Sequence, residues 1–117
     1  CVIDNEVRGM QQRSYAHTGG FSDVEYEILV DIALGMTDRA IAERRNLSLR
    51  SVQNRLHQIY EKLDVYQPGL SAKDEPVLNL RARAVTVAIL RKLLNYGALE
   101  RAETELHGWL SSRRLRN

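Results

Sequence analysis

Residues 48–63, "SLRSVQNRLHQIYEKL", limit the possible folds more than any other stretch of this chain. With about 100° between successive residues of a helix, the apolar side chains fall within one arc about 60° wide: Val52, Leu56, Ile59 and Leu63. An opposite arc, about 100° wide on the same geometry, carries polar side chains: Arg50, Gln53, Asn54, His57 and Glu61. A helix of this kind buries one face in a core and leaves the other for solvent or a ligand.

Helix start and stop signals predict two more helices directly before it. Three segments begin with a residue that can cap a helix N-terminus, namely Ser22, Thr37 and Ser48. Glu25 completes an S-x-x-E capping box in the first segment, and Gly35 ends that helix. The second helix has about nine residues and stops at Asn46, because Asn tolerates the left-handed conformation of a tight turn.

The second and third predicted helices suit a helix-turn-helix arrangement. They are joined by a short turn, and the later helix is longer and more polar on its outer side. Ala42 is small where the two helices must approach closely, and Leu47 can fill the gap between them. This interpretation depends only on the spacing of caps and apolar residues.

The second half of the chain predicts a loop and two further helices. Both prolines lie in "YQPGLSAKDEPVLN", residues 66–79, which we interpret as an extended loop. Asn79 can cap a fourth helix over residues 80–95, which "NYG" breaks at Gly97, and an extra helix is expected over residues 98–112. No period-two alternation persists anywhere, so we expect an all-α fold.

The fourth helix carries more apolar surface than one small core needs, because two apolar stripes run side by side along it. A second contact surface is therefore expected there, and we predict that this helix forms a homodimer. The candidate dimerisation residues are Val85, Ile89, Leu90 and Leu93.

Length and composition favour one domain with appendages. A chain of 117 residues divides into a linker or N-terminal arm (1–20), a helical domain (21–97) and a C-terminal helical extension (98–117). No apolar run is long enough to cross a bilayer, and no signal peptide is recognisable at the start. A single cysteine excludes an intrachain disulfide, so we expect a reducing, cytoplasmic setting.

Catalytic and metal-binding motifs are missing from the sequence. The histidines His17, His57 and His107 lie on separate segments without metal-ligand spacing, and there is neither a glycine-rich phosphate loop nor a nucleophile elbow. We therefore expect no enzyme, no cofactor and no metal.

Residues 21–65, "FSDVEYEILVDIALGMTDRAIAERRNLSLRSVQNRLHQIYEKLDV", resemble the LuxR/NarL-type (GerE-like) DNA-binding domain of bacterial transcription regulators. The resemblance runs over 45 residues without a gap, and "RARAV" at 81–85 is similar to the start of the family's fourth helix. It implies a four-helix, helix-turn-helix domain, here with an extended loop before the fourth helix and an extra C-terminal helix. It also implies the effector domain of a response regulator in a two-component system, bound to DNA as a dimer.

Residue types on the third helix match what major-groove recognition requires. Gln53 and Asn54 can each pair with the edge of an adenine, and His57 can donate to or accept from a base. In the resemblance, these three positions project into the groove. The predicted phosphate contacts are Thr37, Arg39, Arg50, Ser51, Arg55 and Lys62.

Departures from the family pattern keep a second interpretation open. Gln53 stands where the family prefers Lys, Arg55 where it prefers His, Ala40 where it prefers Glu, and Arg45 where it prefers an apolar residue. Arg55 could instead form a salt bridge within the domain. The alternative to sequence-specific DNA binding is a protein-interaction module that keeps the helix-turn-helix fold and binds an RNA polymerase subunit or another regulator.

Overall fold

The computed structural model describes residues 20–66 and 77–116, and the regular secondary structure in these ranges is entirely helical. The helices are α2 (Asp23–Ala33), α3 (Asp38–Arg45), α4 (Leu49–Lys62), α5 (Leu80–Leu90) and α6 (Tyr96–Arg116). The predicted all-α class is thus confirmed for the described residues. The predicted arm, apart from Gly20, and most of the predicted loop at 66–79 lie outside them.

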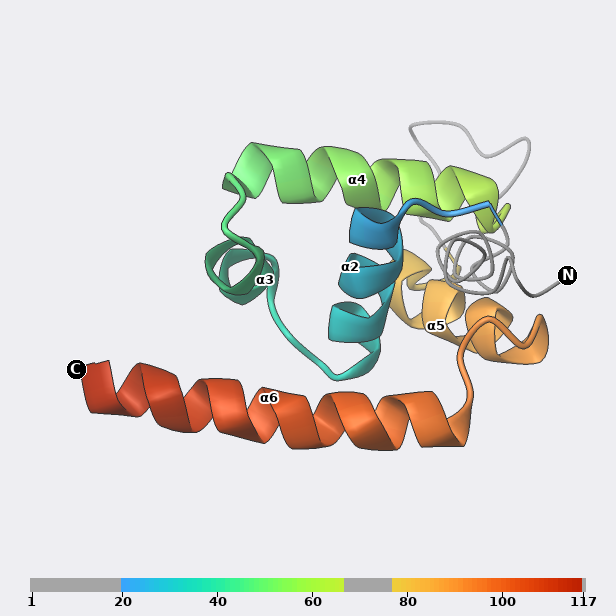
Figure 1. Cartoon of the computed structure of the whole chain (residues 1–117). Coiled ribbons are helices and arrows are strands. Elements are labelled where there is room, and N and C mark those ends of the chain that lie inside the picture. Colours follow the sequence, from blue (N-terminus) through green and yellow to red (C-terminus); the bar gives the residue numbers. More distant parts are fainter. Residues whose placement is uncertain (1–19, 67–76, 117) are drawn as a thin grey trace, which may run out of the picture.

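Helix α2 lies at the centre of the fold. Figure 1 shows α4 on one side of it and α6 on the other, with α5 beside it and α3 at one end of the molecule. Contacts join α2 to α4, α5 and α6, and join α3 to α4. The core collects the apolar faces of these helices and the turns that follow them, including Phe21, Ile28, Leu29, Ile41, Val52, Ile59, Leu63 and Leu94.

Side chains cap the helix N-termini as the sequence predicts. The hydroxyl of Ser22 accepts from the Glu25 backbone at 3.1 Å, and the Glu25 carboxylate accepts from the Ser22 backbone at 3.0 Å, which completes the capping box. The other predicted caps accept backbone N–H groups at 2.9–3.2 Å, namely Thr37, Ser48 and Asn79. Local sequence therefore fixes where α2, α3, α4 and α5 begin.

The helix C-termini use left-handed residues, and two of these are neither glycine nor asparagine. Gly35 (φ 91°) and Asn46 (φ 58°) follow α2 and α3 as predicted, while Asp64 (φ 56°) and Lys92 (φ 64°) follow α4 and α5. The prediction that the fourth helix continues to residue 95 is therefore wrong. Lys92 turns the chain, and the backbone N–H of Leu93 donates to the carbonyl of Ala88 at 2.8 Å, which ends α5 at Leu90.

The bounds predicted for the last helix, 98–112, are also wrong. α6 begins at Tyr96 because the Asn95 side chain accepts from the backbone N–H of Ala98 at 2.8 Å, so "NYG" starts a helix rather than only breaking one. Gly97 lies in the first turn of α6 and is no break. The helix continues to Arg116, past Gly108.

A buried carboxylate joins α2 to α3. Asp31 is fully buried, and its oxygens accept from Arg44 at 3.0 Å and from Arg45 at 2.8 and 2.9 Å. Three charge-assisted hydrogen bonds compensate the carboxylate for its lost hydration. Arg45, one of the departures from the family pattern, therefore has a defined structural partner.

The C-terminal half of α6 contacts α3 through charged and aromatic groups. The ring of Trp109 has the guanidinium carbons of Arg44 and Arg113 at 5.8 and 5.7 Å from its centroid. Arg113 also donates to the carboxylate of Glu43 at 2.7 Å. Trp109 is half-buried against the core, whereas the neighbouring Leu110 is 42% exposed.

Candidate nucleic-acid interface

The outward face of α4 brings the predicted base-contacting residues together. Gln53, Asn54 and His57 are all exposed on this helix, and the helix face opposite to them is buried by Val52, Leu56 and Ile59. In Figure 1, α4 lies along one edge of the molecule, on the far side of α2 from α6. The polar side chains therefore face away from the core.

One flank of α4 is a groove that leads toward the start of α5. Gln53, His57, Tyr66 and Arg81 all line it. The Tyr66 hydroxyl lies 2.6 Å from Nδ1 of His57, and the two rings have centroids 5.3 Å apart. Tyr66 belongs to the candidate site, but the sequence does not predict it. The residue begins the predicted loop, and no local signal indicates that it folds back over α4.

The environment of Tyr66 keeps its phenol protonated. Burial raises its pKa above the usual value of 10.0, and the nearby Glu61 carboxylate and Tyr60 phenol raise it further. Tyr60 and Tyr66 also meet edge to face, with centroids 6.1 Å apart. At neutral pH the Tyr66 hydroxyl is consequently available as a hydrogen-bond donor.

The other flank of α4 is a cationic hollow near its N-terminus. It is lined by Ser48, Arg50, Ser51, Asn54, Arg55 and Gln58. Arg50 is exposed and Ser51 is half-buried, with its backbone N–H donated to the cap hydroxyl of Ser48. Arg55 is half-buried, and its Nε has no hydrogen-bond partner in the described part of the chain. This hollow thus offers positive charge and unsatisfied donor capacity beside Asn54.

The start of α3 supplies the remaining predicted contacts. Thr37 is exposed, although its hydroxyl already caps α3, and Arg39 is exposed one residue into the helix. Arg81 holds this end in place, since it donates to the Asp38 carboxylate at 2.7 Å and to the Met36 carbonyl. The start of α3 is therefore braced from α5.

Lys62 differs from the other predicted phosphate contacts because its charge is already neutralised. Its ammonium lies 2.6 Å from the Glu25 carboxylate and donates to the Gly20 carbonyl at 3.3 Å. Burial by itself raises the pKa of Glu25, but the hydrogen bond from Lys62, the Ser22 backbone N–H and the charges of Lys62 and Arg55 outweigh it and lower that pKa. Lys62 therefore connects the end of α4 to the start of α2.

The predicted dimerisation residues divide into two pairs. Ile89 and Leu90 are 46% and 71% exposed on α5, whereas Val85 and Leu93 are partly buried against the core. Leu93 lies beyond the end of α5, in the turn that Lys92 makes. Of the four predicted residues, Ile89 and Leu90 leave the larger part of the apolar surface open to a partner.

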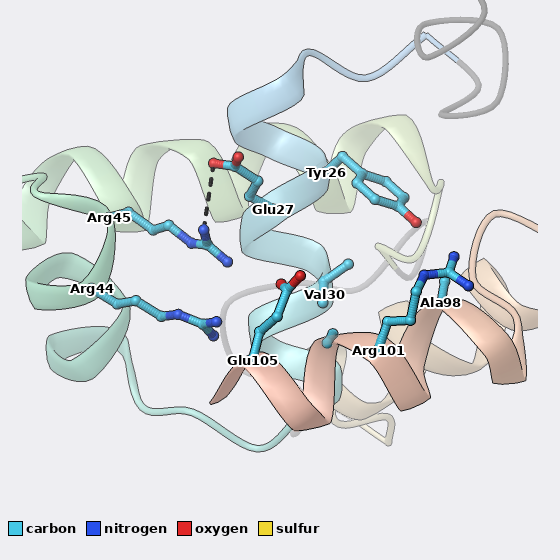
Figure 2. A pocket seen from close by; sticks show the side chains of 9 residues that line it. Tyr26, Glu27, Val30, Arg44, Arg45, Ala98, Arg101 and Glu105 are labelled. Carbon is cyan, nitrogen blue, oxygen red and sulfur yellow. Dashed lines mark ion pairs between the residues drawn. The ribbon is translucent and has the colours of Figure 1, made fainter. Parts of the chain in front are cut away.

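A further hollow lies between α2, α3 and α6. Figure 2 shows its lining, with Arg101 and Glu105 reaching from α6 toward α2 and the ion pair between Arg45 and Glu27 at one edge. Its two α3 arginines, Arg44 and Arg45, are already paired with Asp31. The hollow belongs to the packing of α6, and we assign it no ligand.

No protein-family model, curated protein or solved structure matches this chain. Within residues 20–66 and 77–116, no helix combines the length and apolarity needed to span a bilayer. The same ranges hold no group of three or more His, Cys, Asp or Glu side chains placed to bind a metal ion. The functional proposal therefore depends on the geometry of the α4 surface.

Proposed function

We propose that this chain is a sequence-specific DNA-binding domain of a transcription regulator, with the LuxR-type helix-turn-helix arrangement formed by α3 and α4. The proposal extends to the effector domain of a two-component response regulator, acting in the cytoplasm on double-stranded DNA. RNA polymerase is a further proposed partner.

The observation that carries the proposal is the separation of the two faces of α4. Its apolar face is buried in the core, while Gln53, Asn54 and His57 remain exposed along the other face. A helix fits the major groove, and amide and imidazole side chains can pair with base edges there. Among the described helices, only α4 contains Asn or Gln, the residue types that pair with the edge of an adenine.

The proposed phosphate contacts flank that face. Arg50 and Arg55 line the hollow on one side of α4, and Thr37, Arg39 and Ser51 lie at or near the starts of α3 and α4. Such contacts position a protein on the duplex without reading its sequence. Lys62 is omitted from this set, because Glu25 already neutralises it.

Dimerisation through α5 completes the proposal. A single recognition helix makes few base contacts, and related architectures gain specificity by pairing two half-sites. Ile89 and Leu90 provide an exposed apolar surface on α5 for a second copy, continued by Val85 and Leu93 at its edges.

Selection of bound duplexes from a random pool is the primary test. The proposal expects a motif made of two half-sites at a fixed spacing. Failure to bind any duplex, together with capture of a polymerase subunit or another regulator, would instead favour the protein-interaction alternative.

Substitution of the base-reading pair should reduce discrimination and leave general DNA affinity intact. Gln53→Ala with Asn54→Ala should weaken binding to the selected site by about 30-fold or more, because two base-edge pairings worth about 1–3 kcal/mol each are lost, and change binding to random duplex by less than about twofold. Titration at several salt concentrations provides the measurement.

The salt titration also supplies matched controls for that pair. Arg50→Gln should weaken binding to the selected and the random duplex alike. It should also reduce by about 1 the slope of log affinity against log salt concentration. Thr104→Ala, at an exposed position of α6, should change neither. Equal losses on selected and random duplex for the Gln53 and Asn54 variant contradict the base-reading assignment.

A further inference from the structure

We propose that Tyr66 is a positioning residue that fixes which hydrogen-bonding group His57 presents to DNA. This inference rests on the proposed function, and it deepens it by assigning the chemistry of one base contact. Within the described residues, His57 makes one hydrogen bond, and its partner is Tyr66.

The backbone places Tyr66 over α4 by a defined route. After Lys62 the chain turns through Asp64 in the left-handed conformation, and the Val65 backbone N–H donates to the Tyr60 carbonyl at 3.2 Å. Val65 is buried, which anchors the backbone of Tyr66 beside the end of α4. The phenol consequently returns along α4 to the level of His57.

The hydrogen bond selects one tautomer of the imidazole. A phenol oxygen shares its lone pair with the ring, so its O–H is a stronger donor than its oxygen is an acceptor, and neutral imidazole has one good acceptor nitrogen. Tyr66 therefore donates to Nδ1 of His57, and the ring proton resides on Nε2. If His57 becomes protonated, Nε2 still carries a proton.

As a consequence, Nε2 of His57 is a hydrogen-bond donor in both protonation states, and we place this donor toward the DNA major groove of the proposed complex. The two ring nitrogens point in different directions, so Nε2 is directed away from Tyr66. A donor there pairs with major-groove acceptors, of which guanine offers two in N7 and O6, while cytosine presents a donor. We infer that His57 selects guanine over cytosine at one position of each half-site.

The first test reads the imidazole directly and needs no DNA. Long-range ¹⁵N–¹H correlation spectra of the free protein, recorded over a pH series that reaches the neutral imidazole, should show neutral His57 only as the Nε2–H tautomer with a hydrogen-bonded Nδ1. Tyr66→Phe should move the Nδ1 resonance to that of a free nitrogen and populate the second tautomer. Tyr60→Phe, which leaves the Tyr66 hydroxyl in place, should leave the His57 tautomer unchanged.

The second test reads the base preference. In selection from a random duplex pool, His57→Ala should remove the preference for guanine over cytosine at one position per half-site. Tyr66→Phe should reduce the preference at that same position by about fivefold, the worth of one ordinary hydrogen bond. The double variant should match His57→Ala, because Tyr66 acts only through His57.

The outcomes separate this inference from the proposed function. A His57 in the Nδ1–H tautomer, or a Tyr66→Phe motif identical to that of the unaltered protein, overturns the role of Tyr66 while DNA binding stands. An unaltered protein that returns no motif overturns the proposed function, and the spectra then still decide whether Tyr66 fixes the imidazole.

Discussion

Glu25 shows how one side chain can serve two elements. Its carboxylate closes the capping box of α2 and also accepts from Lys62 at the end of α4, 37 residues along the chain. The first contact follows from the S-x-x-E spacing, which is local and was predicted. The second contact was not, because nothing in the sequence indicates which lysine approaches a given carboxylate after folding.

The lowered pKa of Glu25 predicts an acid-sensitive contribution to stability. A carboxylate whose folded pKa lies below its usual 4.5 stabilises the fold above that pH, and the contribution is lost as pH falls through the folded value. Glu25→Gln should therefore destabilise the protein by about 1–2 kcal/mol at pH 7. Urea denaturation across pH should show the difference shrinking below about pH 4.5.

Glu27→Gln is the matched control for that substitution. Glu27 is exposed on the same helix, and its carboxylate lies 3.8 Å from Arg45, so its loss should cost less than about 0.5 kcal/mol. A difference between Glu25→Gln and the unaltered protein that stays constant from pH 3 to pH 7 would contradict the linkage.

Asp31 marks the limit of prediction for single residues. The sequence shows acids early and arginines later in residues 21–66, a pattern that favours a helical unit whose second half faces an anion. In the structure, part of that positive charge is used internally, since Arg44 and Arg45 both donate to Asp31. Only folding brings residues separated by 13 and 14 positions together.

At the scale of helices, starts were predictable and ends less so. Ser22, Thr37, Ser48 and Asn79 cap helices because a short polar side chain reaches its own first turn, which is a purely local property. The end of α5 at Lys92 had no such signal, since lysine rarely adopts a left-handed conformation. Asn95 carried a capping signal, but "NYG" was interpreted as a break.

The turn after α5 predicts a stabilising substitution. Lys92 is exposed with φ 64°, a conformation that costs a residue with Cβ about 1–2 kcal/mol and glycine much less. Lys92→Gly should therefore raise the free energy of unfolding by about 0.5–1 kcal/mol, after allowing for the added flexibility of the unfolded chain. Thermal or urea denaturation measures this gain.

Thr86→Gly is the control for Lys92→Gly, because it places a glycine inside α5 rather than in the turn that follows it. Thr86 is exposed and helical, so glycine there should destabilise the protein by a few tenths of a kcal/mol. A loss of stability in Lys92→Gly would show that the turn does not keep its left-handed residue in solution.

For the whole molecule, the proposed dimer predicts a change in mass when the exposed apolar residues of α5 become charged. Ile89→Glu with Leu90→Glu should halve the mass observed by sedimentation at micromolar concentration, because the two added carboxylates of each copy would repel those of the other across the proposed interface. Both side chains are exposed, so the fold should survive. Val85 is a poorer choice, because it packs partly against the core.

Thr104→Glu, at an exposed polar position of α6, controls for added charge and should leave the dimer intact. If the unaltered protein and the Ile89 and Leu90 variant have the same mass, α5 is not the dimer surface. Circular dichroism spectra of both proteins should be recorded with the sedimentation data, to show that the variant keeps its helical fold.

The place of α6 has a practical consequence for measuring DNA binding. This helix lies across α2 from α4, so a dye or surface attachment on its exposed side would be separated from the proposed groove-facing side chains by the thickness of the fold (Figure 1). A reporter at His107 or Leu110, for instance, would track the tumbling of the complex without touching the duplex. Helix α6 thus offers a handle for immobilising the protein with the proposed recognition surface free.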